Sequence, residues 1–417
     1  MTRLRILTLS PGFPYPPDDG TKIQTFNRIR FLAARNEVTL LSVSTKPPDS
    51  RYVEVMRQYC GVHLFHTNVR HSSAGPRAKL GNLVRSLWGL TPYYLKEYLV
   101  AEVEEWLQQN LDPNRFDVVE METLTGLYMR PWWPALKVYI NHCISPAVFK
   151  REFAVQKGLL RKLRLLPYGL MEGACLNKVN KMADLAVALT PQSESELRAL
   201  HPAIKASNCL TNGVDLDYFH YRFTRKEPRG FAFVGLMSHP PNIDAVIHFY
   251  QDIFPLIRRR FPDMKFFVVG SSPPHEIKML TSDPSVVVTG RVEDVREYLL
   301  DAGIAVIPTR AGGGILNKIL ESLALGVPVI TRSNSVEGLS VHSGKELLIA
   351  DEPSDFADAA VRMVKDADLR MSLSSQGRKY VERCHQWEHI VRRYEDALRD
   401  LLERQRREQR KGVFRQA

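Results

Sequence analysis

The residues best suited to chemistry lie in the stretch Ile304–Arg332, IAVIPTRAGGGILNKILESLALGVPVITR. Its three consecutive glycines, Gly312, Gly313 and Gly314, leave backbone N–H groups open to close approach by a ligand. A helix is predicted directly after them, because one face repeats the apolar residues Ile315, Leu316, Ile319, Leu320 and Leu323. A glycine loop that leads into a helix N-terminus is an anion-binding arrangement, and it suits a diphosphate.

The opposite face of this helix is polar and carries Asn317, Lys318 and Glu321. A carboxylate two turns into such a helix can accept two hydrogen bonds from a ribose diol. The glycines could instead serve only to pack a tight βα turn. The polar stripe on an otherwise apolar helix favours a nucleotide-binding function over that structural role.

The elements that must position this site are strands that alternate with helices. Short apolar runs predict buried strands at 5–11, 38–43, 62–65, 117–121, 138–140, 185–189, 265–269, 286–289, 304–308, 329–331 and 346–349. This alternation predicts parallel, doubly wound sheets, whose ligands bind beyond the carboxyl ends of the strands. Helices are expected at 21–35, at 243–261 with Asn242 as the N-cap, after 354 and 369, and at 387–407.

Polar side chains end two of the expected strands of the first half. Glu120 and Glu122 end DVVEME, and Asn141 and His142 end VYINH. A second glycine loop precedes the helix at 21–35 and repeats the anion-binding arrangement. It lacks the G-x-G-x-x-G spacing, so a nicotinamide cofactor is not favoured.

Composition bounds the class of protein. The 417 residues suffice for two domains, and Lys+Arg 57 against Asp+Glu 46 gives a net charge of +11. This charge favours an anionic partner, such as a nucleotide, an acidic glycan, an anionic membrane or nucleic acid. Five widely spaced cysteines suggest free thiols in a reducing cytosol. We expect neither a signal peptide nor a membrane span.

The run GGGILNKILESLALGVPVI closely resembles the donor-site motif of the family 4 glycosyltransferases, which are retaining enzymes of the GT-B fold. LTNGVDLDYF resembles the signature that this family places at its domain junction. The resemblance implies an α/β GT-B protein with two Rossmann-like, doubly wound parallel-sheet domains facing a central cleft. We expect an acceptor-side domain over 1–207, a nucleotide-sugar domain over 208–385, and a crossing helix with a basic tail over 386–417.

The resemblance also implies roles for individual residues. Glu321 would hold the donor ribose, whereas the first glutamate of the family's motif is replaced by Gly313 and a frequent arginine by Asn317. The loop at 238–242 lacks the family's Arg and Lys, which leaves Lys318 and Arg310 for the phosphates. His142 and Lys318 are the candidate catalytic residues. The implied nucleotide-binding residues are Gly20, Thr21, Lys22, Arg291, Val292, Arg310, Gly312, Gly313, Gly314, Ile315, Asn317 and Glu321.

The implied reaction moves a hexosyl group from a nucleotide-diphosphate sugar, UDP- or GDP-linked, to a hydroxyl with retention. No Asp-x-Asp motif lies near the donor site, so we expect no metal and no further cofactor. The basic and apolar stretches 77–96 and 150–168 favour a glycan or lipid-linked acceptor. They also favour a cytoplasmic protein peripheral to the anionic inner face of the cell membrane, in polysaccharide synthesis.

Three alternatives stay open at this stage. A sugar-nucleotide epimerase would share the architecture, and a non-catalytic nucleotide-sugar-binding protein would explain the missing glutamate. A nucleic-acid glucosyltransferase would explain the charge, although no reader motif is present and we expect no nucleic-acid partner.

Overall fold

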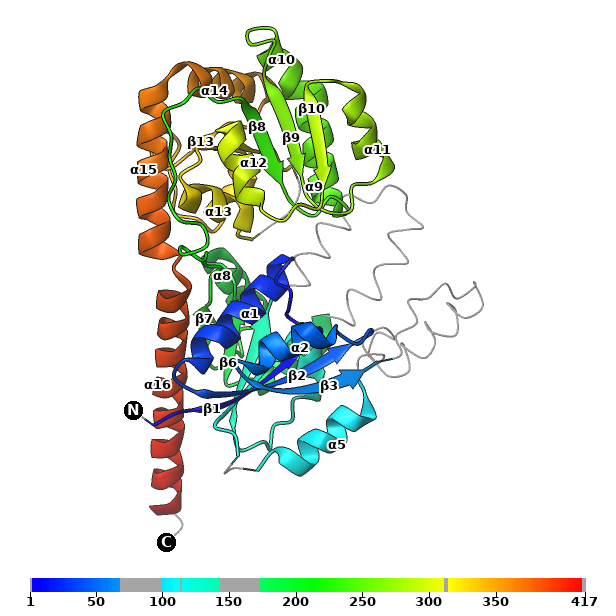
Figure 1. Cartoon of the computed structure of the whole chain (residues 1–417). Helices are drawn as coiled ribbons and strands as arrows, with labels where there is room; N and C mark the ends of the chain where they lie inside the picture. Colours follow the sequence, from blue (N-terminus) through cyan, green and yellow to red (C-terminus); the bar gives the residue numbers. More distant parts are fainter. Residues whose placement is uncertain (1, 68–98, 113–114, 143–172, 311–313, 415–417) are drawn as a thin grey trace, which may run out of the picture. The chain divides into compact units, whose positions relative to one another are not determined.

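The computed structural model describes residues 2–67, 99–112, 115–142, 173–310 and 314–414. They form two compact units, each with its own parallel sheet (Figure 1). Unit 1 comprises Met1–Leu210 and Val391–Ala417, and unit 2 comprises Thr211–Ile390. The last helix, α16 (Trp387–Phe414), begins in unit 2 and continues into unit 1.

Unit 1 contains a sheet of seven parallel strands in the order β3-β2-β1-β4-β5-β6-β7. The strands are β1 (Arg5–Ser10), β2 (Glu37–Ser44), β3 (Gly61–His66), β4 (Val118–Glu122), β5 (Leu136–Asn141), β6 (Leu185–Ala188) and β7 (Ser207–Cys209). The order reverses between β1 and β4, which is the point where doubly wound sheets bind ligands. Six of these strands match the predicted runs, and β7 was not predicted.

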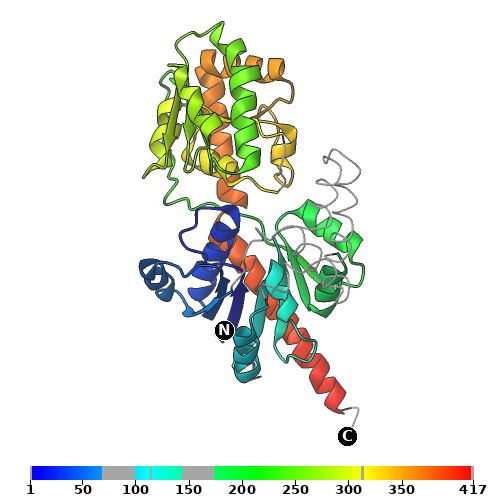
Figure 2. The same ribbon diagram turned by 90° about the vertical axis from the view of Figure 1, so that its right-hand side faces the viewer.

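The helices of unit 1 follow from local sequence signals. They are α1 (Gly20–Ala33), α2 (Ser50–Arg57), the 3₁₀ turn η1 (Thr123–Tyr128), α5 (Ala101–Asn110), a helix at 173–182, and α8 (Pro191–Leu200). Asp19 caps α1, and Thr190 caps α8. Figure 2 shows α16 running along the sheet of unit 1 toward the C-terminus.

Unit 2 repeats the same strand order with six strands, β10-β9-β8-β11-β12-β13. The strands are β8 (Gly230–Val234), β9 (Lys265–Val269), β10 (Val286–Gly290), β11 (Ala305–Ile307), β12 (Val329–Thr331) and β13 (Leu348–Ile349). Both faces of the sheet are buried, because Phe231 and Phe233 pack in one apolar cluster and Ala232 in another. This double burial explains why its strands are nearly continuous apolar runs.

The helices of unit 2 cover both faces of its sheet. They are α9 (Pro240–His248), the π turn η2 (Phe249–Ile253), α10 (Phe254–Arg258), α11 (His275–Lys278), the 3₁₀ turn η3 (Met279–Ser282), α12 (Val295–Ala302), α13 (Asn317–Leu325), the 3₁₀ turn η4 (Ser333–Val336), α14 (Pro353–Lys365) and α15 (Ala367–Cys384). As predicted, Gly326 ends α13, with φ +86°.

The helix predicted over 243–261 is present, but its bounds and regularity were predicted wrongly, because the helical residues run from Pro240 to Arg258 and include a π turn. The chain forms α9, a π turn and α10 instead, because Pro255 has no N–H to continue the α-helical ladder. Asn242 is not the N-cap either. His239 occupies that position, since two prolines favour the start of the helix at Pro240.

Within the residues that the structure describes, we find no helix with the length and apolarity needed to cross a bilayer. The stretches 77–96 and 150–168, on which the predicted membrane association rested, lie outside the described residues.

Candidate functional site

The N-terminus of α13 is open to an anion. The helix begins at Asn317, shortly after Gly314, whose φ of +87° favours glycine. Leu316 occupies the N-cap and supplies no side-chain hydrogen bond to the first turn. Within the described residues, the N–H groups of Asn317 and Lys318 and the positive end of the helix dipole therefore remain available to a ligand. Ile315 is buried in the core beneath this turn, and Gly312 and Gly313 lie outside the described residues.

A lysine ammonium lies beside this helix end. Lys318 Nζ donates to Asn242 Oδ1 at 2.8 Å and lies 4.0 Å from the centroid of the Phe233 ring. Asn242 is oriented in turn by a 2.9 Å hydrogen bond from its Nδ2 to the carbonyl of Leu236. Asn242, which was predicted as a helix cap, therefore positions Lys318, the residue expected to bind the phosphates.

Gly235 gives this lysine its space. A Cβ atom built on Gly235 would lie 2.8 Å from Asn242 Nδ2 and 3.1 Å from Lys318 Nζ. Both separations are too short for ordinary contacts, so any side chain here would displace the pair. The glycine that follows β8 thus belongs to the site, although sequence reasoning did not single it out.

Glu321 lies one helical turn beyond Lys318 and keeps its carboxylate available. Among the described residues, no group donates a hydrogen bond to the Glu321 carboxylate or forms an ion pair with it. Burial raises the pKa of Glu321 to about 7, although the charge of Lys318 lowers it. Burial likewise lowers the pKa of Lys318 to about 7, against the opposite effect of Glu321. Each group gains from a ligand that favours its charged form.

Two buried side-chain oxygen atoms lack hydrogen-bond partners near this helix end. One belongs to a residue that contacts Asn317, and the other to a residue shortly before the glycine loop in the sequence. Asn212 Nδ2 donates to Asn317 Oδ1 at 2.9 Å, which leaves Asn212 Oδ1 without a hydrogen-bond partner among the described residues. Thr309, three residues before Gly312, has a buried hydroxyl that also lacks a hydrogen-bond partner among the described residues. Buried polar atoms of this kind are normally satisfied, which supports a polar ligand here.

Three other residues of unit 2 were predicted to bind the nucleotide: Arg310, Arg291 and Val292. Arg310 forms an ion pair with Asp244 of α9 and is therefore not a free cation. Arg291 and Val292 directly follow β10. Arg291 is exposed, whereas Val292 packs partly against the core. The structure thus brings Lys318, Asn317 and Glu321 together on α13.

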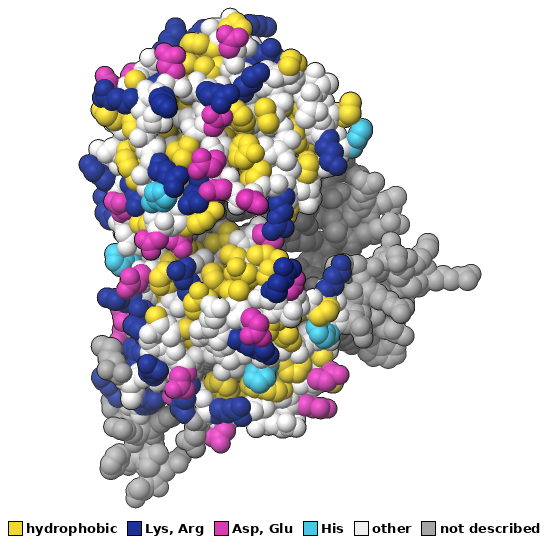
Figure 3. Space-filling view, in the orientation of Figure 1, with side chains coloured by type: hydrophobic (Ala, Val, Ile, Leu, Met, Phe, Trp, Pro, Cys, Tyr) yellow, Lys and Arg dark blue, Asp and Glu magenta, His cyan; other side chains and the backbone are white. Residues whose placement is uncertain are grey.

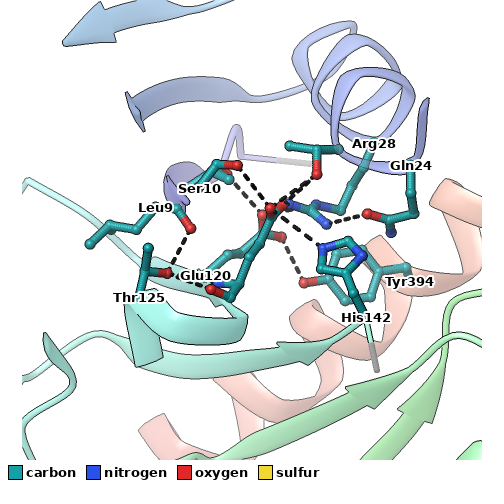
Figure 4. A network of polar contacts seen from close by, with 11 residues as sticks. Leu9, Ser10, Gln24, Arg28, Glu120, Thr125, His142 and Tyr394 are labelled. Carbon is teal, nitrogen blue, oxygen red and sulfur yellow. Dashed lines mark hydrogen bonds and ion pairs between the residues drawn. The ribbon is translucent and has the colours of Figure 1, made fainter. Parts of the chain in front are cut away.

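In unit 1, the polar residues at the carboxyl ends of β1, β4 and β5 form one buried network (Figure 4). Arg28 of α1 is fully buried and forms ion pairs with Glu120, at 3.2 Å, and with Glu122. Parallel register places Thr8 beside Glu120, and the Thr8 hydroxyl donates to that carboxylate at 2.8 Å. Sequence reasoning missed Arg28, although two carboxylates on one face of a buried strand require a buried cation.

The electrostatics of this network favour charged groups despite burial. Burial by itself raises the pKa of Glu122, but the charge of Arg28 and the contact with His142 lower it to about 2. Burial lowers the pKa of Arg28, and Glu120 and Glu122 raise it above its ordinary value. Glu122 also accepts hydrogen bonds from Ser10 and Thr25, at 3.0 and 2.9 Å. The carboxylate is therefore a fixed anion.

His142 faces this fixed anion from the end of β5. Its Nε2 atom lies 3.5 Å from Glu122 Oε2, and the side chain is 4% exposed. Neither ring nitrogen makes a hydrogen bond within the described residues. A buried imidazole beside a carboxylate can donate to, or accept from, a ligand hydroxyl with the ring held in place.

The other predicted residues of unit 1, Gly20, Thr21 and Lys22, form the first turn of α1. Asp19 accepts from the Lys22 N–H at 2.9 Å, and Lys22 Nζ pairs with Asp18 at 2.7 Å. This helix end already carries a carboxylate cap, unlike the N-terminus of α13. A ligand phosphate at α1 would have to share the site with Asp19.

Comparisons with known proteins agree with this geometry. Residues 228–366 match the family model described as "Glycosyl transferases group 1". The chain is 26% identical over 148 residues to N-acetyl-alpha-D-glucosaminyl L-malate synthase of Bacillus anthracis. It is 28% identical over 160 residues to a GDP-mannose-dependent alpha-(1-6)-phosphatidylinositol monomannoside mannosyltransferase of Mycobacterium tuberculosis. These matches cover 34% and 35% of this chain, and 38% and 42% of the length of the two relatives.

Solved structures match over nearly the whole chain. Sucrose-phosphate synthase from Thermosynechococcus elongatus superposes with a TM-score of 0.69 at 17% identity, covering 96% of this chain and 100% of that one. Anabaena HepE in complex with UDP and glucose gives 0.65 at 14% identity, covering 95% and 99%. The predicted resemblance to family 4 glycosyltransferases and the predicted GT-B fold are thus confirmed.

Proposed function

We propose that this chain transfers a hexosyl group from a nucleotide-diphosphate sugar to a hydroxyl of a glycan or lipid-linked acceptor, with retention. The observation that carries the proposal is a set of groups on α13: open N–H donors, the Lys318 side chain that Asn242 orients, and a Glu321 carboxylate with no partner among the described residues. A diphosphate would take the first two, and a ribose diol would take the third. The mycobacterial relative is GDP-mannose-dependent, and the similar structure of HepE contains UDP and glucose. Both support a UDP- or GDP-linked donor for this chain.

In the proposed reaction, charge develops on the departing nucleotide diphosphate. The N-terminus of α13 and Lys318 are fixed before the reaction, so they would stabilise that charge without reorganisation. This route uses the chain's own cations in place of a metal or a further cofactor. His142, held beside Glu122, would contact the sugar or the acceptor hydroxyl.

The first test is calorimetric binding of UDP, GDP, ADP and TDP to the wild type and to Glu321→Ala. We expect one nucleotide to bind, with the substitution costing about 1–3 kcal/mol, the range for a charge-assisted hydrogen bond. Glu276→Ala, at an exposed position on α11, is the matched control and should bind like the wild type. Absence of binding by every nucleotide would remove the basis of the proposal.

A second test concerns turnover of the nucleotide sugar that the first test identifies. Product analysis by NMR in the presence of hydroxyl acceptors should show a new glycosidic bond with the anomeric configuration of the donor. Isomerised nucleotide sugar without acceptor would indicate an epimerase instead. Binding with no turnover across an acceptor panel would indicate a non-catalytic binding protein.

The proposed setting is the cytoplasmic side of a membrane, in the synthesis of a cell-surface polysaccharide. Its support is the net charge of +11 and the basic, apolar composition of 77–96 and 150–168. Deleting the positive charges of either stretch should reduce sedimentation with anionic vesicles. Full retention of vesicle binding in both variants would contradict this assignment.

A further inference from the structure

A lysine-lined hollow lies at the other end of the unit 1 sheet. It encloses about 520 Å³ and is lined by Pro131, Lys137, Ala174, Asn177, Lys178, Lys181, Met182 and Lys205. Lys137 is the second residue of β5, and Lys205 lies two residues before β7. These positions are at the amino ends of the strands, whereas His142 follows the carboxyl end of β5. Five residues of extended chain separate Lys137 from His142, about 16 Å.

One aspartate already organises two of the lysines. Asp184, directly before β6, accepts from Lys137 Nζ at 2.8 Å and from Lys205 Nζ at 2.7 Å, one through each carboxylate oxygen. Its Oδ2 also accepts from the backbone N–H of Lys137 at 2.9 Å. Lys137 has 6% of its side chain exposed, so one cation of the hollow is built into the fold.

The remaining two lysines bring charge that no acidic side chain among the described residues pairs with. Lys178 and Lys181 are exposed, lie three residues apart on one face of the helix at 173–182, and form no ion pair with any described residue. Their field reaches neighbouring groups. Burial first, and the charge of Lys181 second, lower the pKa of His201, whose Nδ1 lies 3.1 Å from Asn177 Oδ1.

The hollow gathers four lysines around one aspartate. On the face drawn in Figure 3, basic and acidic side chains are interspersed over both units. Like charges held together in a hollow repel one another, so an anion that enters it gains from several ammonium groups at once. A phosphate, with three or more acceptor oxygens, matches several point-charge donors better than a planar carboxylate does.

We propose that this hollow, the lysine pocket, binds a phosphate group at a site separate from the donor site on α13. Lys178 and Lys181 supply the cations that have no ion pair within the described residues, and Lys137 and Lys205 supply the two cations fixed on Asp184. Two sources carry the same chemistry: a free phosphorylated small molecule and a phospholipid headgroup. Trp132, which follows Pro131, is 74% exposed. Tryptophan is typical of membrane interfaces, so the experiment tests a phospholipid headgroup separately from a free phosphate.

Site-resolved acetylation of lysines tests the proposal on the full-length protein. Mass spectrometry would follow the modification rates of Lys178 and Lys181 with and without inorganic phosphate, and with vesicles of phosphatidylglycerol or of phosphatidylcholine. The internal controls are Lys278 and Lys379, two exposed lysines of unit 2. We expect at least threefold protection of Lys178 and Lys181, and none of the controls.

The comparison of inorganic phosphate with the two kinds of vesicle distinguishes a free phosphorylated ligand from a phospholipid headgroup. Protection by inorganic phosphate supports a free phosphorylated ligand, and protection by phosphatidylglycerol vesicles alone supports a headgroup. Equal rates under every condition would overturn the proposal, because the lysines would then be merely solvated. This outcome does not depend on nucleotide binding or turnover, so it leaves the proposed transferase function untouched.

A double variant gives an independent measurement. Lys178→Ala with Lys181→Ala should weaken binding of the protecting ligand at least tenfold, since alanine keeps the helix and removes the two cations that Asp184 does not hold. Lys278→Ala with Lys379→Ala changes the net charge equally and should bind like the wild type. Equal affinity in both double variants would overturn the proposal even if protection were seen.

Discussion

The hydroxyl of Tyr394 donates to Oε1 of Glu120 at 2.6 Å and so ties the C-terminal helix to the central strand of unit 1. The other oxygen of Glu120 accepts from Thr8 at 2.8 Å and from Arg28 at 3.2 Å. Both oxygens are therefore satisfied, and all four side chains are buried. Glu120 acts as a structural anion that holds α1 and α16 against the sheet.

Tyr394→Phe should lower the free energy of unfolding by about 1–3 kcal/mol. The substitution keeps the ring and removes the donor, which leaves one oxygen of a buried carboxylate unsatisfied. Urea denaturation followed by tryptophan fluorescence measures the change. Tyr52→Phe is the control, because its ring also packs in unit 1 and its hydroxyl makes no hydrogen bond within the described residues. Equal losses in the two variants would contradict the assigned role.

Glu122→Gln should remove an acid-sensitive part of the stability. The pKa of Glu122 falls from 4.5 to about 2 on folding, so its contribution is present above pH 4.5 and is lost as the pH falls toward 2. Between pH 5 and pH 3 this shift is worth about 2 kcal/mol. The wild type should therefore lose about that much more stability than Glu122→Gln over this interval.

Urea denaturation at several pH values between 5 and 3 provides the comparison. At neutral pH, Glu122→Gln should already be less stable by about 3–5 kcal/mol, because it leaves part of the buried Arg28 charge uncompensated. Parallel pH profiles of the two proteins would show that Glu122 is not the titrating group.

The sequence predicted most of the strands well because strand patterns are local. The nucleotide site on α13 also rests on local patterns, and it stays a prediction. Apolar runs mark strands buried on two faces, and glycine before a helix marks an anion site. Lys318 and Glu321 share a helix face whatever the tertiary structure, so their neighbourhood could be read from spacing alone. Gly326 ends α13 for an equally local reason, its positive φ.

The residues that were missed act through long-range contacts. Arg28 meets Glu120 and Glu122 across more than ninety positions, and nothing in α1 alone distinguishes it from a solvated arginine. Gly235 matters only because α9 and α13 bring Asn242 and Lys318 against it. Such roles emerge from tertiary packing, so periodicity and spacing do not contain them.

Gly235→Ala should weaken nucleotide binding about tenfold or more while the protein stays folded. The new Cβ atom meets the ends of the Asn242 and Lys318 side chains, which can move, and so displaces the lysine from its position. Calorimetry reports the affinity, and thermal unfolding reports the stability. Gly61→Ala, on the edge strand β3, where an added Cβ would come no closer than 3.6 Å to any neighbour, should change neither.

Gly270→Ala, after the neighbouring strand β9, is a comparison variant in which the added Cβ would meet backbone atoms. Gly270 has φ +152°, and an added Cβ would lie 1.7 Å from the backbone oxygen of Gly235. Backbone atoms cannot move aside as side chains can, so this variant should unfold at lower temperature than Gly235→Ala. If Gly235→Ala were instead the less stable variant with unchanged affinity, the glycine would serve packing and not the site.

Nucleotide binding at pH 8 should be accompanied by uptake of nearly one proton. Burial lowers the pKa of Lys318 to about 7, so at pH 8 most of this lysine is neutral in the free protein. A bound diphosphate favours the ammonium and raises the pKa of Lys318 in the complex. Glu321, with a pKa of about 7, is already mostly ionised at pH 8, and so is the nucleotide phosphate. The uptake therefore reports on Lys318, and the affinity should fall as the pH rises above 7.

Calorimetry in two buffers of different ionisation enthalpy at the same pH measures the protons taken up. Lys318→Arg is the informative control, because a guanidinium stays charged at pH 8 and should bind nucleotide without proton uptake. Lys318→Met should bind more weakly and also without uptake. If the wild type took up no protons while Lys318→Met bound equally well, the phosphate would not lie against Lys318. The N–H groups of α13 would then hold the diphosphate without help from this lysine.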